Sequence, residues 1–458
     1  MGRMDILDFV VIGAGPAGEA AGFKARALGA SVAVIDRGWF GGSCPHVGCV
    51  PSKSLLHAAE RHASGADYSW QRASDRRDYM VNRRPGDPEP DDTSHVRALE
   101  DAGARTYRGA GRITGRGIVT VTGEGGQVGL RARNIVVAVG SRSKVPPVPG
   151  IEGVHPWTNR DATLARELPQ SLLVLGGGPT GCELAQVYAR FGVPVTVVQS
   201  GPRLTPTEHP RSAEAIRFAL ERDGVTVRTG VRAVRARPGS GAGGAHVVDL
   251  DDGSTAEGHV VLLAVGRVFP VDDLGLEHYG VAVAGPDAYR RDGALRLADG
   301  LWVAGDPAGP ELHTHQAHYQ GELVVRMALG EDVRPDYRAL PRSTYTSPEA
   351  ASVGLTLDQA LAAGIDAFEC VTRYPESARG YSVEAETGHV TIVVDRATRQ
   401  LVGAAMACPD ASAAIHECVL AIKARVPVGV LAETIHAFPS TSRIFNGLFN
   451  QARDELGR

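Results

Sequence analysis

The sequence predicts an α/β protein in which one strand–turn–helix–strand unit occurs twice, followed by a separate α+β domain. Three observations support this prediction. The segments Phe9–Gly38 and Leu172–Gly201 are similar in sequence, and their glycines have the same spacing. After about Gly330 no such glycine pattern follows, and short strands alternate with two amphipathic helices. A chain of 458 residues is also too long for one ordinary core, so several domains are expected.

Each copy consists of an apolar strand, a G-x-G-x-x-G turn, an Ala-rich amphipathic helix and a second strand rich in Val and Ile. The glycines of such a turn allow a tight bend and bring the backbone close to a pyrophosphate, whose charge lies at the helix N-terminus. Because strand and helix accompany both turns, we predict two Rossmann-like dinucleotide-binding domains. The glycines are Gly13, Gly15 and Gly18 in the first copy and Gly176, Gly178 and Gly181 in the second.

The two copies differ at the end of the second strand. Asp36 offers a carboxylate that accepts hydrogen bonds from a ribose, whereas the neutral Gln199 stands at the equivalent position of the second copy. We therefore expect two different dinucleotides, as in an electron relay. Arg203 follows closely and offers a cation for a 2′-phosphate, so the sequence favours NADPH over NADH at the second site.

Two cysteines stand five positions apart in the segment GGSCPHVGCVPSKSL. Cys44 and Cys49 precede a helix that we predict from about Pro51 through His62. A helix N-terminus favours thiolate over thiol, which lowers the cysteine pKa. We interpret the pair as redox-active. The alternatives are two buried free thiols or a metal site, for which only His46 offers a further ligand nearby.

The remaining cysteines and a histidine-rich segment are interpreted as structural, so no metal site is predicted. Four isolated cysteines are expected to be small core residues: Cys182, Cys370, Cys408 and Cys418. Three histidines follow the apolar strand and turn LWVAGD, and we expect them to pack near a cofactor rather than bind a metal: His313, His315 and His318.

Composition and charge exclude several classes of partner. The net charge is −4 and the arginines are scattered among acidic residues, so a nucleic-acid partner is not expected. The first predicted strand begins near Leu7, which leaves no room for a signal peptide, and the apolar runs, such as Val260–Val265, are too short to cross a membrane. We expect a cytoplasmic protein that acts on a small molecule.

The order of the motifs resembles that of the pyridine nucleotide–disulfide oxidoreductases, the family of lipoamide dehydrogenase, glutathione reductase and mercuric reductase. The motifs are GAGPAG, GGSCPHVGCVPSK, IVVAVGS, GGGPTGCE, LWVAGD and YTSPEAASVGLT. The resemblance implies an FAD-binding domain in two parts (1–150, with the cysteine pair, and 271–335), an NAD(P)H-binding domain (151–270) and a C-terminal α+β dimerisation domain (336–458). It also implies a homodimer whose active site is completed by the C-terminal domain of the partner subunit.

The same resemblance implies roles for individual residues around the cofactors. FAD would occupy the first glycine turn, with Asp36 on its adenosine ribose and Asp306 near its ribityl chain or phosphates, and NAD(P)H would use the second turn. Lys53 matches a lysine near flavin N5 and Glu183 its carboxylate partner; a cation there would stabilise negative charge on reduced flavin. Further motif positions expected to line the cofactors are Gly42, Ser43, Gly140, Ser141 and Gly266.

For the chemistry, the resemblance implies that electrons pass from nicotinamide to flavin and then to a Cys44–Cys49 disulfide. Cys49, nearer the flavin, would be the charge-transfer thiolate, and Cys44 would be the interchange thiol that forms a mixed disulfide with the substrate. We therefore predict a reductase of a disulfide or related sulfur compound, or a dithiol oxidase working in the opposite direction.

The C-terminal region departs from the family pattern. The family's acid–base histidine lies in an H-P-T-x-S-E motif supplied across the dimer interface. Here the segment reads IHAFPSTSR, which places Phe438 at the histidine position and Arg443 at that of the partner glutamate. Because a positioned acid–base group contributes about 10²–10⁴-fold, we predict an altered proton relay that uses water, His46 or the substrate. His436 matches a second, upstream histidine, and its movement into the site is the alternative.

Two other functions follow from these features. Cys44-Pro45-His46 resembles the redox motif of 2-ketopropyl-coenzyme M oxidoreductase/carboxylase, which implies reductive thioether C–S cleavage with or without carboxylation, although Pro51-Ser52-Lys53 follows the ordinary reductases. The remaining hypothesis is a flavin-bound electron-transfer or interaction protein that has lost turnover. The presence of both cysteines and both glycine turns argues against it.

Overall fold

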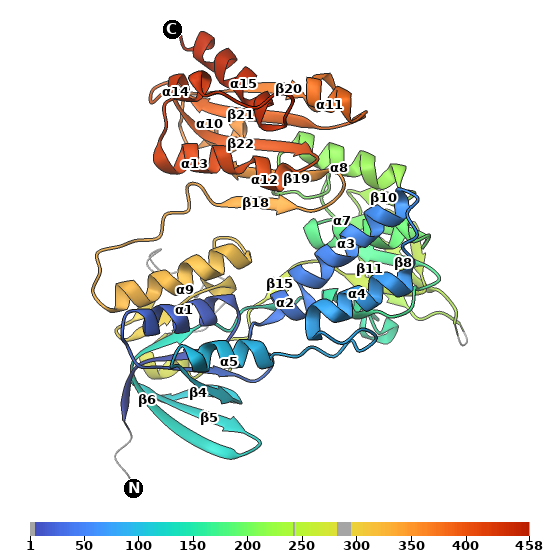
Figure 1. Cartoon of the computed structure of the whole chain (residues 1–458). Coiled ribbons are helices and arrows are strands. Elements are labelled where there is room, and N and C mark those ends of the chain that lie inside the picture. Colours follow the sequence, from blue (N-terminus) through green and yellow to red (C-terminus); the bar gives the residue numbers. More distant parts are fainter. Residues whose placement is uncertain (1–4, 241–242, 282–294, 458) are drawn as a thin grey trace. The chain divides into compact units, whose positions relative to one another are not determined.

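The computed structural model describes residues 5–240, 243–281 and 295–457 (Figure 1). Its internal contacts divide the chain into two compact units. The first unit consists of Met1–Ser54, Ser74–Lys144 and Gly266–Pro335, and the second of Leu55–Ala73, Val145–Val265 and Asp336–Arg458. Each unit is therefore assembled from segments that lie far apart in the sequence. Among the described residues, no helix is both long and apolar enough to span a membrane.

The first unit is built on an eight-stranded sheet whose central strands are parallel. Their order is β17-β6-β1-β2-β3, and β1 and β2 are joined by helix α1, which is the predicted strand–turn–helix–strand unit. The parallel strands and this helix are β1 (Ile6–Ile12), α1 (Pro16–Ala27), β2 (Val32–Asp36), β3 (Arg105–Arg108), β6 (Gly126–Val137) and β17 (Leu301–Val303). The antiparallel additions are β4 (Ala110–Gly115), β5 (Ile118–Gly123) and β16 (Arg296–Ala298).

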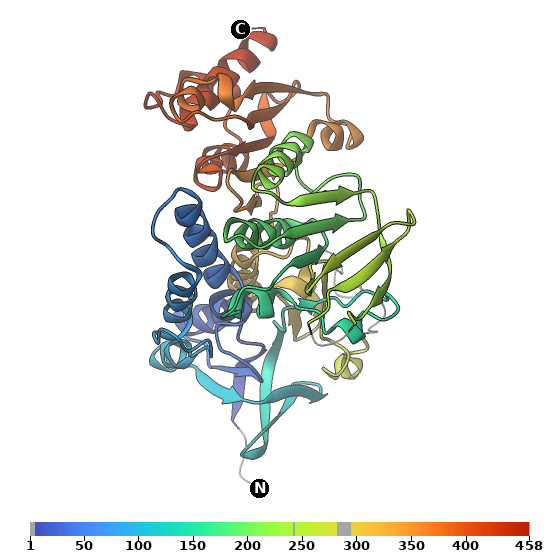
Figure 2. The same ribbon diagram turned by 90° about the vertical axis from the view of Figure 1, so that its right-hand side faces the viewer.

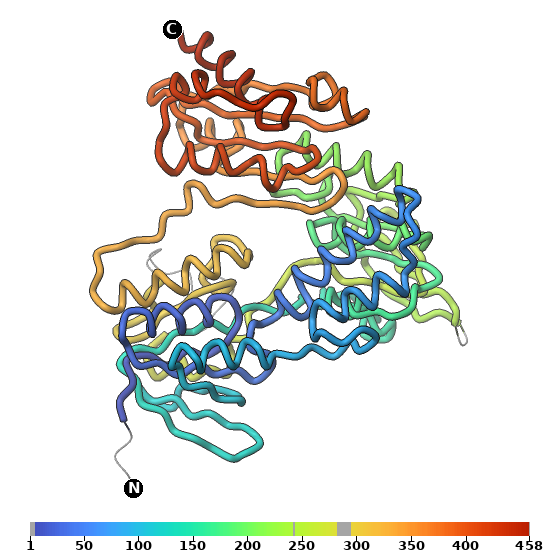
Figure 3. The backbone as a smooth tube through the Cα atoms, in the orientation of Figure 1, coloured from blue at the N-terminus to red at the C-terminus, as the bar shows by residue number. Residues whose placement is uncertain are grey.

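A second helix of this unit packs closely on the first. Helix α9 (Thr314–Ala328) runs beside α1, as the yellow-orange and dark blue tubes of Figure 3 show. At the contact, a Cβ on Gly321 would lie 2.1 Å from the carbonyl oxygen of Ala17, so only glycine allows this approach. The close packing fixes Thr314, the first residue of α9, relative to the glycine turn that precedes α1.

The helix that we predicted from about Pro51 begins earlier and is preceded by another. Cys44 lies within α2 (Ser43–Val47), and Cys49 is the first residue of α3 (Cys49–Ala63), which contains the predicted helix. Gly48 separates the two helices, and a Cβ there would lie 2.9 Å from the carbonyl oxygen of Ser43. The break turns the chain sharply between the cysteines. Helices α4 (Trp70–Asn82) and α5 (Thr93–Asp101) follow.

The second unit contains the second copy of the repeat. Its parallel sheet has the order β10-β9-β8-β14, with α7 joining β8 to β9 and α8 joining β9 to β10. The elements are α6 (Asn159–Leu164), β8 (Leu172–Leu175), α7 (Pro179–Arg190), β9 (Val195–Gln199), α8 (Pro210–Arg222), β10 (Thr226–Thr229) and β14 (Val260–Leu263). An antiparallel sheet is inserted before β14: β11 (Ala233–Arg237), β12 (His246–Leu250) and β13 (Thr255–Gly258).

The C-terminal part of the second unit is an antiparallel sheet covered by helices. Its strand order is β18-β19-β22-β21-β20, and helix α8 packs against β19 and β22 (Figure 2). The strands are β18 (Pro341–Thr344), β19 (Glu349–Gly354), β20 (Ala367–Arg373), β21 (His389–Asp395) and β22 (Gln400–Cys408). The helices outnumber the two expected: α10 (Leu357–Ala362), α11 (Ala378–Ser382), α12 (Ala411–Ala414), α13 (His416–Ala424), α14 (Val428–Glu433) and α15 (Ser442–Glu455). The shorter of them lack the length that makes helical periodicity visible in a sequence.

Candidate active site

The two glycine turns have the same construction. Gly13 and Gly176 have φ values of +105° and +108°, a region that favours glycine. A Cβ on either residue would lie 2.3 Å from a carbonyl oxygen, that of Ala138 or Ala264, at the end of a neighbouring strand. The sequence repeat is therefore also a structural repeat. In both copies a carbonyl oxygen of a neighbouring strand excludes a side chain at the first glycine.

The other glycines of each turn have distinct roles. A Cβ on Gly18 or Gly181 would lie 1.8 or 2.0 Å from the carbonyl oxygen of the first glycine of its own turn, so the helix packs directly on the strand end. The middle glycines face open space, because a Cβ on Gly178 would meet no atom within 4 Å and one on Gly15 only the Cα of Gly42, at 3.8 Å. That open side leaves room for a pyrophosphate to approach the backbone.

Asp36 and Gln199 occupy equivalent positions and make equivalent hydrogen bonds. The backbone N–H of Ala14 donates to Asp36 Oδ2 at 2.7 Å, and that of Gly177 donates to Gln199 Oε1 at 2.8 Å. Burial raises the pKa of the Asp36 carboxyl group above its usual range. Arg203 is exposed and donates to the backbone oxygen of Pro206 at 3.1 Å. The two turns thus carry a carboxyl group in one copy and a neutral amide in the other.

The segments IVVAVGS and LWVAGD meet at the carboxyl ends of β6 and β17. The hydroxyl of Ser141 donates a hydrogen bond to Asp306 Oδ2, and the guanidinium of Arg267 lies 3.7 Å from the same oxygen. Gly140 and Gly266 both have positive φ, at +62° and +115°. A short antiparallel pair, β7 (Arg142–Ser143) with β15 (Arg267–Val268), joins the two segments that follow these glycines. Arg267 is a site residue that the sequence analysis missed.

The two cysteine thiols of the redox segment lie against each other. Both are free thiols, Cys44 partly buried and Cys49 exposed. The Cys49 sulfur hydrogen-bonds to the Cys44 thiol and, together with burial, raises the Cys44 pKa far above that of a free cysteine. The neighbouring sulfur thus opposes the lowering of the cysteine pKa that we expected from a helix N-terminus.

Thr314 contacts both cysteines and was not identified from the sequence. Its hydroxyl oxygen lies 3.5 Å from Cys49 Sγ, and its hydrogen bond to Cys44 favours the thiolate. A hydroxyl donates readily to a thiolate sulfur, so Thr314 stabilises whichever cysteine carries the negative charge. The neighbouring rings of His313 and His315 stack at 5.0 Å, and no group of three or more potential metal ligands occurs in the described part of the chain.

His46 is buried behind the redox segment. It is 1% exposed, and its Nε2–H donates to the backbone oxygen of Phe40 at 2.8 Å. Burial lowers the pKa of the imidazole, so the ring is neutral, with Nδ1 as its bare nitrogen. Nδ1 has no hydrogen-bond partner among the described residues. The histidine two positions after Cys44 is therefore enclosed rather than presented to solvent.

The C-terminal segment exposes an aromatic ring where the family pattern has its histidine. Phe438 is 73% exposed, and Arg443 is bonded to Asn446 one turn along α15. His436, in contrast, has a 6% exposed side chain whose Nε2 lies 2.7 Å from Glu417 Oε1 and whose Nδ1 lies 2.9 Å from the Thr434 oxygen. Both ring nitrogens thus face acceptor oxygens, and His436 is held away from solvent.

Comparison with known proteins decides the family. The model of the pyridine nucleotide-disulphide oxidoreductases matches residues 7–321, and that of their dimerisation domain matches residues 340–448. The chain belongs to this family. Dihydrolipoyl dehydrogenase of Chlorobaculum tepidum is 32% identical over 98% of both chains, and mercuric reductase of Bacillus cereus is 29% identical over 93% of this chain and 68% of its own.

Solved structures of the same family have the same fold. The flavoprotein disulfide reductase RclA of Escherichia coli, solved as a C43S variant with Cu(II), superposes with a TM-score of 0.85 at 26% identity, covering 98% of this chain and 99% of that one. LpdA of Mycobacterium tuberculosis superposes with a TM-score of 0.86 at 27% identity, covering 97% and 99%. This pyridine nucleotide-disulphide oxidoreductase is thus an enzyme that depends on FAD and NAD(P)H and acts on a sulfur group.

The residues of the first unit fit FAD. The open side of Gly15 and the positive φ of Gly42, where a Cβ would lie 2.7 Å from the Cα of Gly15, leave a backbone-lined surface for a pyrophosphate. Asp36 and Asp306 add carboxyl groups at the ends of β2 and β17. Lys53 is partly buried in α3, with its Nζ 3.5 Å from Ser52 Oγ.

Glu183 belongs to the second unit and is 5% exposed. Its Oε1 accepts a hydrogen bond from the backbone N–H of Tyr345 at 2.9 Å. Its pairing with Lys53 stays a prediction. The four cysteines expected in the core are all buried: Cys182, Cys370, Cys408 and Cys418.

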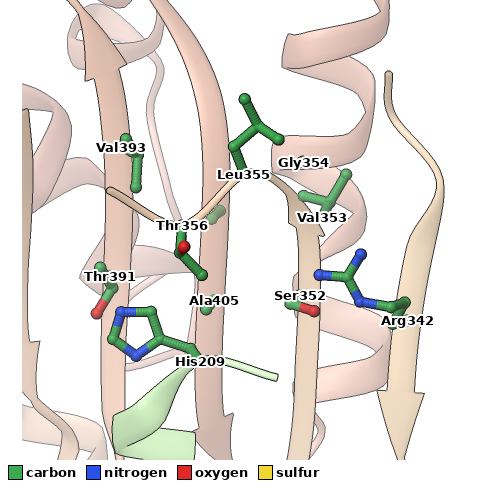
Figure 4. Close-up of a pocket in the computed structure, with 11 residues that line it drawn as sticks. His209, Arg342, Ser352, Val353, Gly354, Leu355, Thr356, Thr391, Val393 and Ala405 are labelled. Atoms are coloured by element: carbon green, nitrogen blue, oxygen red, sulfur yellow. The ribbon is translucent and has the colours of Figure 1, made fainter. Parts of the chain in front are cut away.

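A small pocket in the second unit lies between the start of α8 and the C-terminal sheet (Figure 4). His209, Arg342, Ser352 and Thr391 line it together with apolar residues of the sheet. Glu208 accepts hydrogen bonds from Arg342 Nε at 3.3 Å and from Ser352 Oγ. These bonds satisfy the buried charges and join α8 to the sheet, so we assign the pocket a structural role.

The second glycine turn allows a test that separates binding from folding. Gly178→Ala should raise the KM for NAD(P)H at least about tenfold, because the added Cβ meets no protein atom but projects where the pyrophosphate must approach. FAD content and melting temperature should stay unchanged. Gly125→Ala, in another position where a Cβ has no neighbour within 4 Å, is the matched control. An unchanged KM would show that NAD(P)H does not use this turn.

Proposed function

We propose that this enzyme uses NADPH to reduce a disulfide or a closely related sulfur compound through Cys44 and Cys49, or oxidises a dithiol in the opposite direction. The contact between the two sulfurs, with Thr314 bonded to both, carries the proposal. It supports a pair that exchanges between dithiol and disulfide at one site. Bound FAD would take electrons from NADPH and pass them to this pair.

The roles of the two cysteines follow from the family motif, with Cys49 as the thiolate next to the flavin and Cys44 as the thiol that meets the substrate. The hydrogen bond between the two sulfurs supports a pair in which one sulfur carries the proton and the other the negative charge. To attack, Cys44 must first lose its proton, and the departing thiolate of the substrate must gain one. The absence of a histidine at Phe438 means that neither transfer is served by the family's usual C-terminal group.

We further propose that the enzyme works as a homodimer. The match to the dimerisation domain supports this assembly. Large apolar side chains in the C-terminal part of the chain also support it, because they are exposed in the single subunit. Their exposed fractions are 97% for Ile435, 73% for Phe438 and 66% for Leu420.

A panel of disulfides and thioethers, each assayed with NADPH and with NADH under anaerobic conditions, tests the substrate class. We expect stoichiometric thiol from at least one disulfide and faster turnover with NADPH. Turnover of thioethers alone would replace this function by reductive C–S cleavage. That second candidate is favoured by the enclosed, neutral His46 and the exposed Phe438, which together leave few proton donors near a carbanion.

Nucleotide preference has a test of its own. Gln199→Glu keeps the oxygen that accepts from the Gly177 N–H but adds a negative charge, so we expect kcat/KM for NADPH to fall about tenfold or more while that for NADH does not fall. Arg203→Gln should also impair NADPH selectively. Arg237→Gln, another exposed arginine of the same unit, serves as control. Equal changes for both nucleotides would contradict a 2′-phosphate site.

A further inference from the structure

The two sulfurs of the redox pair and one hydroxyl group form a connected set of hydrogen bonds. The Cys49 sulfur is hydrogen-bonded to the Cys44 thiol, and the Thr314 hydroxyl is hydrogen-bonded to Cys44 and lies 3.5 Å from Cys49 Sγ. The backbone N–H of Cys49 also donates to the Cys44 sulfur. All three residues belong to the first unit. The Cys44 sulfur therefore has two hydrogen-bond donors in addition to its contact with the second sulfur.

These donors allow the negative charge of the pair to lie on either sulfur. When Cys49 carries the charge, the Cys44 thiol donates to it. When the proton is on Cys49 instead, the Cys44 thiolate accepts from the Cys49 N–H and from the Thr314 hydroxyl. Both donors favour the charged form of Cys44, whereas burial and the neighbouring sulfur oppose it. The proton therefore passes between the two sulfurs without a further group entering the site.

The surrounding titratable groups do not replace this contact. Within one helical turn of the three residues in the sequence, the other titratable side chains are His46, Lys53, Glu311, His313, His315 and His318. His46 is neutral because burial lowers its pKa. The largest effects on the pKa of the Cys44 thiol come from Cys49, from burial and from Thr314. The second cysteine is thus the group with which Cys44 exchanges a proton most directly.

We propose that Cys49 is the acid–base group of Cys44 in disulfide reduction, so that the redox pair itself supplies the proton transfers that lack a histidine at Phe438, and that Thr314 stabilises the negative charge that the two sulfurs share. This inference rests on the proposed function. A base must lie within hydrogen-bond reach of the proton that it takes, and Cys49 meets this requirement within one subunit.

The reaction balances in atoms and electrons. The Cys49 thiolate takes the proton of the Cys44 thiol, and the resulting Cys44 thiolate attacks one sulfur of the substrate disulfide. The S–S bond of the substrate breaks, a mixed disulfide with Cys44 forms, and the departing thiolate takes the proton from the Cys49 thiol. The Cys49 thiolate then attacks the Cys44 sulfur. This forms the Cys44–Cys49 disulfide and releases the second thiolate, which takes a proton from solvent. The pair loses two electrons and the substrate gains them.

The test compares two pH titrations of the FAD-containing protein after anaerobic two-electron reduction. The long-wavelength thiolate–flavin absorbance reports the charge on Cys49. The rate of alkylation by iodoacetamide, assigned to Cys44 by fragment mass spectrometry, reports the charge on Cys44. Because one proton is shared, both signals should rise with the same apparent pKa as the pH increases and then stay level. Alkylation of Cys44 that stays at its baseline through this pKa and rises only at a higher pH would overturn the proposal.

Substitutions of Thr314 provide a second readout. Thr314→Val replaces the hydroxyl by a methyl group and should move both titrations together to higher pH by about one pH unit, because a donor to the shared charge is lost. Thr314→Ser keeps the hydroxyl and should titrate like the wild type. The control is Thr114→Val, which removes an exposed hydroxyl of the same unit that lies 3.0 Å from Thr120 Oγ1. A shift of only one of the two titrations in Thr314→Val would contradict a shared charge.

The proposed function and this inference fail in different ways. If the wild type reduces no disulfide, the proposed function fails, but the two titrations still decide whether Cys49 takes a proton from Cys44. If disulfides are reduced and the titrations do not coincide, the function stands and the proton of Cys44 goes to another acceptor.

Discussion

Cys44→Ser should lower kcat for disulfide reduction by at least about 10³-fold while the two-electron-reduced protein keeps its long-wavelength thiolate–flavin absorbance. Serine keeps the shape of the side chain but is too weak an acid to form the attacking anion. The absorbance persists because Cys49, with Thr314 at 3.5 Å, remains in place to carry the negative charge. Stopped-flow assays of NADPH oxidation with and without substrate, together with anaerobic spectra, provide both measurements.

Cys49→Ser is the matched control for this experiment, since the two cysteines are near neighbours on either side of Gly48. We expect it to lose both turnover and the long-wavelength absorbance. Substantial turnover in Cys44→Ser, or absorbance that follows Cys44 instead of Cys49, would exchange the roles that we assign to the two residues.

Restoring the family's C-terminal histidine and glutamate should speed disulfide reduction. Phe438→His with Arg443→Glu should raise kcat for disulfide reduction by about 10²-fold, because a positioned acid–base group then serves the proton transfers of Cys44. Phe438 is 73% exposed, so the substitution removes little packing within the subunit. The measurement is the pH dependence of kcat in the wild type and in this double variant.

Ile435→His provides the control, because this residue is 97% exposed in the same loop but stands away from the motif position. It should not raise kcat. No gain in the double variant would argue against Phe438 and Arg443 as the positions of the family's proton-transfer pair.

The parts of the site that could be predicted from the sequence are those whose requirements are local. Gly13 and Gly18 are needed because backbone atoms of the same turn and the adjacent strand exclude any side chain. Every turn of this type has the same backbone contacts, so the glycine motif in the sequence predicts them directly. Asp36 and Gln199 were likewise found from their distance to the first glycine, and each caps its own turn through one hydrogen bond.

What the sequence did not reveal depends on contacts between distant segments. Glu19 and His95 form a hydrogen bond although they are 76 positions apart in the sequence. Thr314 and Cys49 do the same across 265 positions. No periodicity or motif links such residues. They come together only because α1, α5 and α9 pack around α2 and α3, the helices that carry Cys44 and Cys49. The raised pKa of Cys44 was missed for a related reason. It arises from the approach of the two sulfurs across the Gly48 break between α2 and α3, and the sequence predicted no helix at Cys44.

The central claim is that Cys44 and Cys49 form a redox centre in addition to the flavin. An anaerobic titration with dithionite, read by the absorbance of the flavin, tests this claim most directly. The wild-type enzyme should take up about two two-electron equivalents per FAD, and the Cys44→Ser/Cys49→Ser double variant about one. Uptake of only one equivalent by the wild type, starting from fully oxidised protein, would contradict the account.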